Sequence, residues 1–280
     1  MSTDKTPEQP ELPPAVRRLW GIDAPRRRGP KPALSTARIV QAAMDVADTE
    51  GLPAVSMARV AEALGYTPMS LYRHVANKDE LLLLMVDAVA DDPPEIPDEA
   101  GWREGLELWT RAQIDVGVRR PWMLELPLSS APPGPHRVRW MDQAFKALRT
   151  IDLPADEKLA MIGLLAQHVL GEARVQVESH RAAVQQVLRD SGLPASTPES
   201  ELDPAAVEAA NPWADLEALL VRSAGPGGYP HLFAAFSTWD ATASTPPDDE
   251  ISFGIRILLD GVETYLRRRG ALPDEQPDEG

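Results

Sequence analysis

One short segment concentrates side chains that can bind DNA bases and phosphates. Residues 65 to 80 read GYTPMSLYRHVANKDE. Its closely spaced polar groups are Ser70, Tyr72, Arg73 and His74. Leu71 and Val75 stand four residues apart and therefore form a packing stripe on a helix. The pattern predicts a short helix with one face packed against a core and another free to read DNA.

The borders of this segment predict a turn between two helices. Gly65 ends a stretch of apolar periodicity, where a left-handed residue closes a helix at low cost. Thr67 is expected to supply an N-cap oxygen, and Pro68 then occupies the first helical position, which tolerates proline. The preceding helix begins at the N-cap Ser56. Together these signals indicate a helix-turn-helix.

The reading helix must be held by neighbouring helices. Between residues 35 and 92 four helices are predicted: 35–50, 56–65, 67–75 and 77–92. Asn77 is expected to cap the fourth, with Glu80 reaching back as in a capping box. The fourth helix is apolar nearly all round, so it is expected to join this domain to the following region.

The remaining chain predicts an all-α protein of two folded parts. Residues 93–280 show no β signal, and helices are expected at 99–119, 136–151, 155–190, 204–223, 229–240 and 249–269. We therefore predict an N-terminal helix-turn-helix DNA-binding domain at 35–92 and a helical ligand-binding and dimerisation domain at 93–280. Residues 1–34 contain seven prolines and are expected to be a disordered basic arm. Its basic cluster is Arg26, Arg27, Arg28 and Lys31.

Charge is distributed unevenly, which reconciles DNA binding with a net charge of -15. Residues 15–78 hold ten Lys or Arg against five Asp or Glu, whereas residues 93–280 hold seventeen against thirty. The acidic part would be repelled by DNA, so only the N-terminal region is expected to face the duplex. The basic cluster is expected to enter the minor groove or neutralise flanking phosphates.

Composition also limits the compartment and the chemistry. The chain has no cysteine, which excludes disulfides and thiolate zinc sites. It has no stretch of about 20 apolar residues and no apolar segment at its polar, proline-rich start. A cytoplasmic protein with no membrane contact is therefore expected.

The run from Leu64 to Lys78 resembles the DNA-binding signature of the TetR family of repressors, especially the branch of the tetracycline repressor. The resemblance covers residues 35 to 92 and implies a homodimer that binds a palindromic operator. It places Tyr72 and Lys78 at phosphates, with a packing role as the alternative for Tyr72. It places Thr67, Met69, Ser70 and Arg73 at bases, with a phosphate contact as the alternative for Arg73. A phosphate contact and a structural role remain equally open for His74, and Ser56 and the basic cluster complete the predicted set.

The second region carries candidate ligand-binding residues. Twelve of the fifteen aromatic residues lie beyond residue 100, which suits an apolar cavity. Gln113 is the lone polar member of an apolar helix face and could bind a ligand or a neighbouring helix. His168 and Glu172 form a polar pair that is either satisfied in the core or used for a ligand, and metal ligation is disfavoured because two ligands at helical spacing do not make a site. The predicted ligand set is Trp109, Gln113, Trp122, Trp140, Phe145, His168 and Glu172, with no metal site and no cofactor.

Apolar stripes on helices 155–190 and 249–269 leave two arrangements open. They could pair with their symmetry copies as a four-helix bundle, or serve one core within the chain. The stripe on helix 249–269 comprises Ile251, Ile255, Leu258, Leu259, Val262 and Leu266.

Three functions compete at this point. The first is a homodimeric repressor released from its operator by an apolar or aromatic small molecule. The second is a DNA-binding regulator without a small-molecule ligand, controlled by a protein or acting as an activator. The third is an enzyme, which is disfavoured because the sequence has no nucleophile elbow, P-loop, dinucleotide fingerprint or metal motif.

Overall fold

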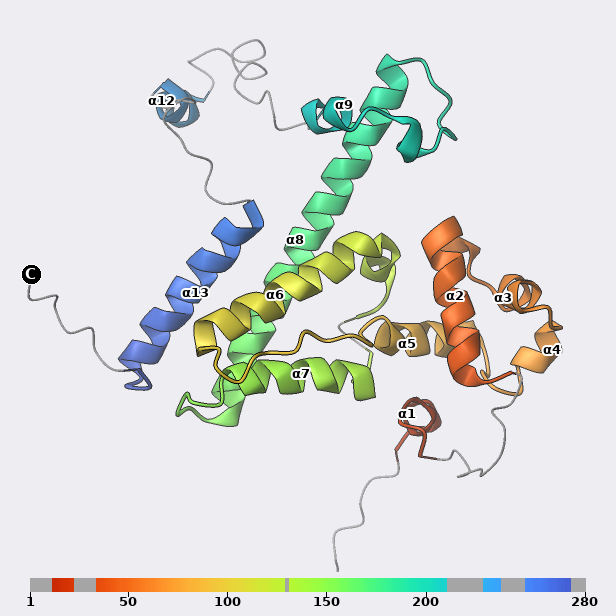
Figure 1. Ribbon diagram of the computed structural model, residues 1–280, viewed down its shortest axis with the longest axis horizontal. Coiled ribbons are helices and arrows are strands. Elements are labelled where there is room, and N and C mark those ends of the chain that lie inside the picture. The colour runs from red at the N-terminus through yellow and green to blue at the C-terminus, as the bar shows by residue number, and fades with distance from the viewer. Residues whose placement is uncertain (1–11, 23–33, 129–130, 211–228, 238–249, 273–280) are drawn as a thin grey trace, which may run out of the picture. The chain divides into compact units, whose positions relative to one another are not determined.

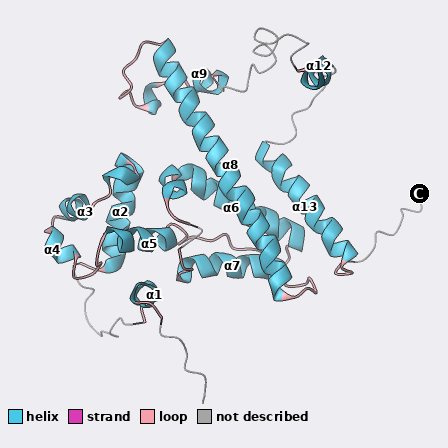
Figure 2. Ribbon diagram, turned by 180° about the vertical axis from the view of Figure 1, so that it is seen from behind, coloured by secondary structure: helices cyan, strands magenta, loops and turns pink. Residues whose placement is uncertain are grey.

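The computed structural model describes residues 12–22, 34–128, 131–210, 229–237 and 250–272. Every regular element in these ranges is a helix, so the predicted all-α fold class is confirmed (Figure 2). The chain divides into two compact units, residues 1–162 and 163–280. The domain boundary predicted after residue 92 lies inside the first of these units and stays a prediction. Within the described ranges, no helix combines the length and the apolarity needed to cross a membrane.

The helix-turn-helix helices follow the predicted order (Figure 1). They are α2 (Thr36–Glu50), α3 (Met57–Leu64), α4 (Pro68–Leu71) and α5 (Lys78–Ala88), with the 3-10 helix η1 (Leu52–Ala54) between α2 and α3. Each of the three longer helices begins at a side-chain cap, supplied by Ser35, Ser56 and Asn77. These caps satisfy backbone amides that have no partner inside the helix.

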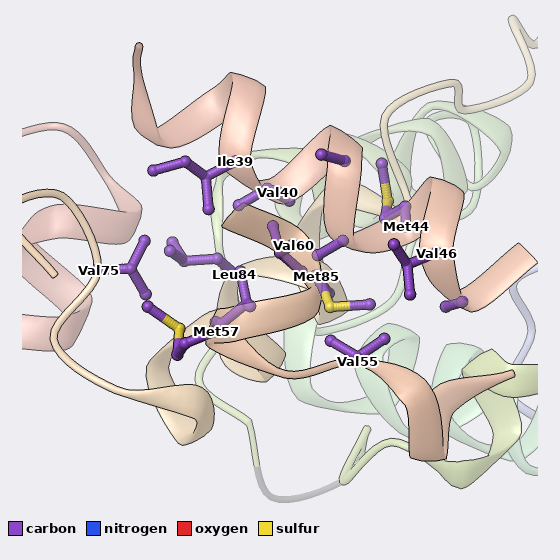
Figure 3. Close-up of a cluster of buried hydrophobic side chains, with 14 of the residues drawn as sticks. Ile39, Val40, Met44, Val46, Val55, Met57, Val60, Val75, Leu84 and Met85 are labelled. Carbon is purple, nitrogen blue, oxygen red and sulfur yellow. The ribbon is translucent and has the colours of Figure 1, made fainter. Parts of the chain in front are cut away.

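A single apolar core holds these helices together. Ile39, Val60 and Met85 come from α2, α3 and α5, and their side chains are fully buried (Figure 3). Leu71 and Val75 reach the same core and are also fully buried. Burying a side chain of this size stabilises the fold by about 1.5–3 kcal/mol. The apolar stripe of residues 67–75, here called the reading turn, therefore fixes this segment to the domain.

The same core extends beyond residue 92. It includes Trp122 and Met123 of the 3-10 helix η2 (Pro121–Glu125), together with Leu126. Helix α6 (Trp102–Arg119) packs against α7 (Pro135–Ala147), and a Cβ at Gly105 would lie 2.7 Å from the Ala147 Cβ. Shared burial of these later residues explains why the first unit continues to residue 162.

The second unit contains most of α8 (Ala155–Asp190), then η3 (Glu199–Glu201), α9 (Pro204–Ala209), α12 (Pro230–Ser237) and α13 (Glu250–Arg268). The bounds of α8 agree with the prediction of 155–190. The helix predicted at 204–223 ends at Ala209, and residues 211–228 lie outside the described residues.

The apolar stripe on α13 is covered within a single chain. Ile255, Leu259, Val262 and Leu266 are exposed by 4% or less. On α8, Val169 and Ala173 are likewise buried, whereas Leu159 is 44% exposed. Of the two arrangements that the sequence left open, the buried stripe on α13 fits a core within the chain.

A short helix, α1 (Pro14–Leu19), lies in the segment that was predicted to be disordered. That prediction is wrong for residues 14–19. Pro14 stands in the first turn, where proline is compatible with a helix. Leu19 packs against the core of the first unit, which provides the burial that the isolated segment lacks.

Candidate nucleic-acid interface

The turn before the reading helix is built as the sequence predicts. The Ser56 hydroxyl accepts a hydrogen bond from the Arg59 amide at 3.1 Å and starts α3. Gly65 ends α3 with φ 74°, in the left-handed region. A residue with a side chain would be strained at that φ, so glycine is required for the sharp turn into α4.

The start of α4 differs from the prediction. Thr67 stands at the N-cap position but makes no side-chain capping bond. Its hydroxyl and that of Ser70 hydrogen-bond each other at 3.0 Å instead. The helix ends at Leu71, and an i to i+3 bond from the His74 amide to the Leu71 carbonyl, at 2.8 Å, tightens the next turn. The α-helix is therefore shorter than the predicted 67–75.

The polar and apolar residues of the reading turn separate onto two faces. Met69 is 71% exposed and Tyr72 is 45% exposed, whereas Leu71 and Val75 are fully buried. Thr67, Arg73 and Lys78 are also exposed, and Ser56, Ser70 and His74 are half-buried. The structure thus brings the predicted base-reading side chains to the outer side of one turn. The basic cluster at 26–31 lies outside the described residues.

Lys78 is the first residue of α5, where backbone amides and the helix dipole favour an anion. Asn77 caps this helix by accepting a hydrogen bond from the Glu80 amide at 2.8 Å. The Glu80 carboxylate accepts from the Ala76 amide at 2.6 Å, one residue earlier than a capping box requires. The Asn77 cap agrees with the sequence prediction, whereas the partner of Glu80 does not.

An exposed ion pair joins α2 to α3, and no sequence pattern predicted it. The Arg59 Nη2 atom lies 2.6 Å from Glu50 Oε1. The hydrogen bond from Arg59 holds the pKa of Glu50 below its ordinary value, and the bond to Glu50 raises the pKa of Arg59. The two residues lie near the junction of α2 and α3 but nine positions apart, so no single-helix spacing signals them.

Two family models match the chain. One, described as bacterial regulatory proteins of the tetR family, matches residues 39–85. The other, described as the tetracyclin repressor-like C-terminal domain, matches residues 94–266 and so covers more than half of the chain. The chain belongs to the tetR family. The predicted resemblance is confirmed.

Relatives of this tetR-family protein are similar over most of their length. The HTH-type transcriptional repressor DrrR1 of Streptomyces coeruleorubidus is 32% identical over 254 residues, which cover 90% of this chain and 85% of that protein. The structure of Streptomyces coelicolor ActR in complex with actinorhodin has a TM-score of 0.62 and 25% identity, covering 83% of this chain and 96% of that one. ActR in complex with (S)-DNPA has a TM-score of 0.54 and 25% identity, covering 84% and 99%.

The tryptophans of the predicted ligand set hold helices of the tetR-family fold together. Trp109 donates from Nε1 to the Trp140 carbonyl at 2.7 Å, and Trp140 donates to the Ala90 carbonyl at 3.0 Å. Trp122 donates to the Asp48 carboxylate and is buried in the core of the helix-turn-helix. The indole N–H groups of all three are therefore occupied by protein acceptors.

Two other members of the ligand set in the first unit are half-buried. The Gln113 amide lies 3.4 Å from the Trp109 carbonyl, one turn earlier in the same helix, to which it donates a long hydrogen bond. Phe145 is on α7. Gln113 therefore has a partner on its own helix.

The second unit contains His168 and Glu172. Glu172 accepts a hydrogen bond from Gln176 at 2.9 Å, so it is not paired with His168. The His168 Nε2 atom is buried and has no hydrogen-bond partner among the described residues. A Cβ at Gly254 of α13 would lie 2.9 Å from His168 Cε1, so glycine makes room for the imidazole ring.

A buried carboxylate joins α5 to α7 and was also missed. Asp87 is 3% exposed and accepts from the amides of His136 and Arg137, at 3.2 and 3.0 Å, at the start of α7. The Arg137 guanidinium in turn donates to the carbonyls of Leu128 and Ala131. Burial lowers the pKa of Arg137, which the nearby Asp87 partly offsets. A single carboxylate inside the apolar run LLLLMVDAVA could have predicted this contact, because a buried carboxylate requires hydrogen-bond donors.

Proposed function

We propose that the chain is a homodimeric repressor that binds a palindromic operator in double-stranded DNA and is released by an apolar or aromatic small molecule. The observation that carries the DNA-binding part is the reading turn, where Met69, Tyr72 and Arg73 are exposed while Leu71 and Val75 are buried. The name of the similar DrrR1 protein supports repression rather than activation.

The exposed residues divide into two roles on DNA. Tyr72 and Lys78 contact phosphates, which fix the position of the protein without reading sequence. Thr67, Met69, Ser70 and Arg73 reach base edges in the major groove. Ser56, His74 and the basic cluster at Arg26, Arg27, Arg28 and Lys31 add further contacts to the backbone. A two-fold dimer presents this turn twice, to grooves roughly 34–36 Å apart.

Exposed apolar side chains on α8 and α13 provide the pairing surface. Val175 is 56% exposed on α8, and Phe253 and Ile257 are 49% and 55% exposed on α13. Phe253 and Ile257 stand four residues apart and share one helix face. Large apolar side chains grouped in this way favour burial against a second copy of the chain.

The effector is assigned to the second unit, where the His168 side chain offers a hydrogen bond. Its buried Nε2 atom has no partner in the described part of the chain, and buried polar atoms are normally paired. A small molecule with one polar group beside an apolar or aromatic body satisfies that atom. The ActR structures with actinorhodin and (S)-DNPA support a small-molecule effector. Glu172, one turn from His168 on α8, is the second residue proposed for this site. The ligand roles of Trp109, Gln113, Trp122, Trp140 and Phe145, which lie in the first unit, stay predictions.

Release follows from a shift between two conformations. Helix α5 carries Lys78 at its start and Asp87 near its end, where Asp87 is bonded to α7. A ligand that favours a different orientation of α5 changes the spacing of the two reading turns. Moving the population from 1:99 to 99:1 needs about 5.5 kcal/mol of differential binding.

The test is one titration with two readouts. Operators are first selected from random duplexes, and aromatic small molecules beginning with actinorhodin are then added to the protein–operator complex. Quenching of tryptophan fluorescence and loss of operator binding are expected to follow the same saturation curve, and His168→Ala is expected to shift both together. Quenching without release would contradict induction. If no compound quenches while the operator binds, the second hypothesis is favoured, a regulator without a small-molecule ligand.

A further inference from the structure

Three consecutive residues at the end of α1 each reach a different part of the first unit. Arg18 forms an ion pair and hydrogen bond with Glu80 of α5, through Nε and Oε1. Leu19 packs against the core formed by α2, α3 and α5. The Trp20 indole donates to the Pro133 carbonyl at 3.2 Å, in the loop before α7. Helix α1 thus bridges the start of α5 and the loop that leads into α7.

Glu80 is the residue through which α1 contacts the helix-turn-helix. Its side chain is only 6% exposed, and its two oxygens are divided between two partners. Oε1 binds Arg18, and Oε2 accepts from the Ala76 amide at 2.6 Å. Ala76 and Asn77 form the link between the reading turn and α5, so Glu80 holds this link in place. A buried carboxylate that loses its charged partner is costly, and the surrounding backbone then relaxes to expose it.

We propose that Arg18 is a positioning residue for DNA binding, acting through Glu80 on the link between the reading turn and Lys78. The inference rests on the proposed DNA binding. Arg18 neutralises the buried end of Glu80, which leaves the other oxygen fixed on Ala76. With Ala76 fixed, Tyr72 and Lys78 on either side of the link keep a constant separation. Two phosphate contacts are then preorganised before DNA arrives.

Arg18 differs from an arginine that binds phosphate directly. Its Nε is already bonded to a carboxylate, and its neighbours Leu19 and Trp20 are both in contact with the protein. A phosphate contact would release counterions and contribute to the salt dependence of binding. A positioning residue changes affinity at every salt concentration by the same factor. The slope of log Kd against log salt therefore separates the two roles.

The experiment compares full-length variants on one selected operator duplex across a salt series. Arg18→Ala and Glu80→Gln are each expected to weaken binding roughly five- to tenfold with an unchanged salt slope. The double variant is expected to bind no more weakly than the weaker single variant, because both changes break the same link. Arg18→Lys should restore part of the affinity. Arg181→Ala, which removes an exposed charge on α8, is the matched control and should bind as the unchanged protein does.

Hydrogen exchange at the Ala76 amide provides a second readout that does not depend on DNA. Faster exchange is expected in Arg18→Ala and in Glu80→Gln, but not in Arg181→Ala. A salt slope smaller by about one would show instead that Arg18 contacts a phosphate. Unchanged affinity and unchanged Ala76 exchange would overturn the proposal. If the unchanged protein selects no duplex, the proposed DNA binding fails, while exchange at Ala76 still tests the link from Arg18.

Discussion

Arg73 and Lys78 are both exposed cations near the reading turn, but they are expected to act differently on DNA. If Arg73 forms a bidentate contact with guanine, Arg73→Ala should cost about 1–3 kcal/mol on the best operator and relax one base position. Lys78→Ala should weaken binding to all sequences alike and lower the salt slope by about one. Selection from random duplexes with each variant measures both effects.

Arg181→Ala again serves as the control for the loss of one exposed charge. If Arg73→Ala keeps the base preference of the unchanged protein and lowers the salt slope, Arg73 contacts a phosphate. That result would select the alternative contact for this residue and would leave base reading to Thr67, Met69 and Ser70.

Individual caps were predictable because they depend on a few neighbouring residues. Ser56 and Asn77 each bond an amide three positions later, and Gly65 adopts the left-handed backbone that its place after α3 indicates. Thr67 failed as a cap for an equally local reason. Its hydroxyl is hydrogen-bonded to the Ser70 hydroxyl, three residues away, in place of a backbone amide.

At the scale of elements, the ion pair between Glu50 and Arg59 is expected to make the stability of the reader depend on pH. The pKa of Glu50 is lowered in the folded state, so its contribution is present above the ordinary pKa and is lost as pH falls through the folded value. Glu50→Gln should therefore lower the thermal midpoint at pH 7 and have a smaller effect at a pH below the ordinary glutamate pKa of about 4.3, with the effect vanishing once the pH is below the lowered folded pKa. Calorimetry at both pH values measures the difference.

Asp45→Asn is a control for the loss of an exposed carboxylate on α2, since the Asp45 carboxylate accepts a hydrogen bond from Gln41 of the same helix rather than joining two helices. Its thermal midpoint should change less than that of Glu50→Gln at pH 7. Equal changes in the two variants at pH 7 would mean that general charge on α2, rather than the pair with Arg59, sets the midpoint.

The joints between elements were not predictable, because they connect residues far apart in the chain. Trp122 and Asp48 are separated by 74 positions, and Arg18 and Glu80 by 62. Periodicity and caps predict each helix but do not show which polar groups meet across helices. Residue type likewise does not show that Trp122 packs in the core of the helix-turn-helix, and its ligand role stays a prediction.

For the whole molecule, the apolar stripe on α13 does not determine how two chains assemble. Its periodicity correctly indicates a buried face, but periodicity cannot distinguish burial in the same chain from burial against a copy. The structure buries Ile255, Leu259 and Val262 within one chain and leaves Phe253 and Ile257 exposed. The proposed dimer therefore uses a different face of α13 from the one that the sequence indicated.

Ile257→Glu is expected to weaken this dimer. The side chain is 55% exposed in a single chain, and burying that exposed part in both copies would contribute roughly 2–3 kcal/mol, or about 15- to 250-fold in the dimer dissociation constant. Light scattering after size exclusion should show a monomer at micromolar concentration, with operator binding lost at the same time. Leu108→Glu on α6, where Leu108 is 40% exposed, is the matched control and should remain dimeric. A dimeric Ile257→Glu protein would place the interface elsewhere, because a buried pair of new carboxylates repels across a two-fold axis.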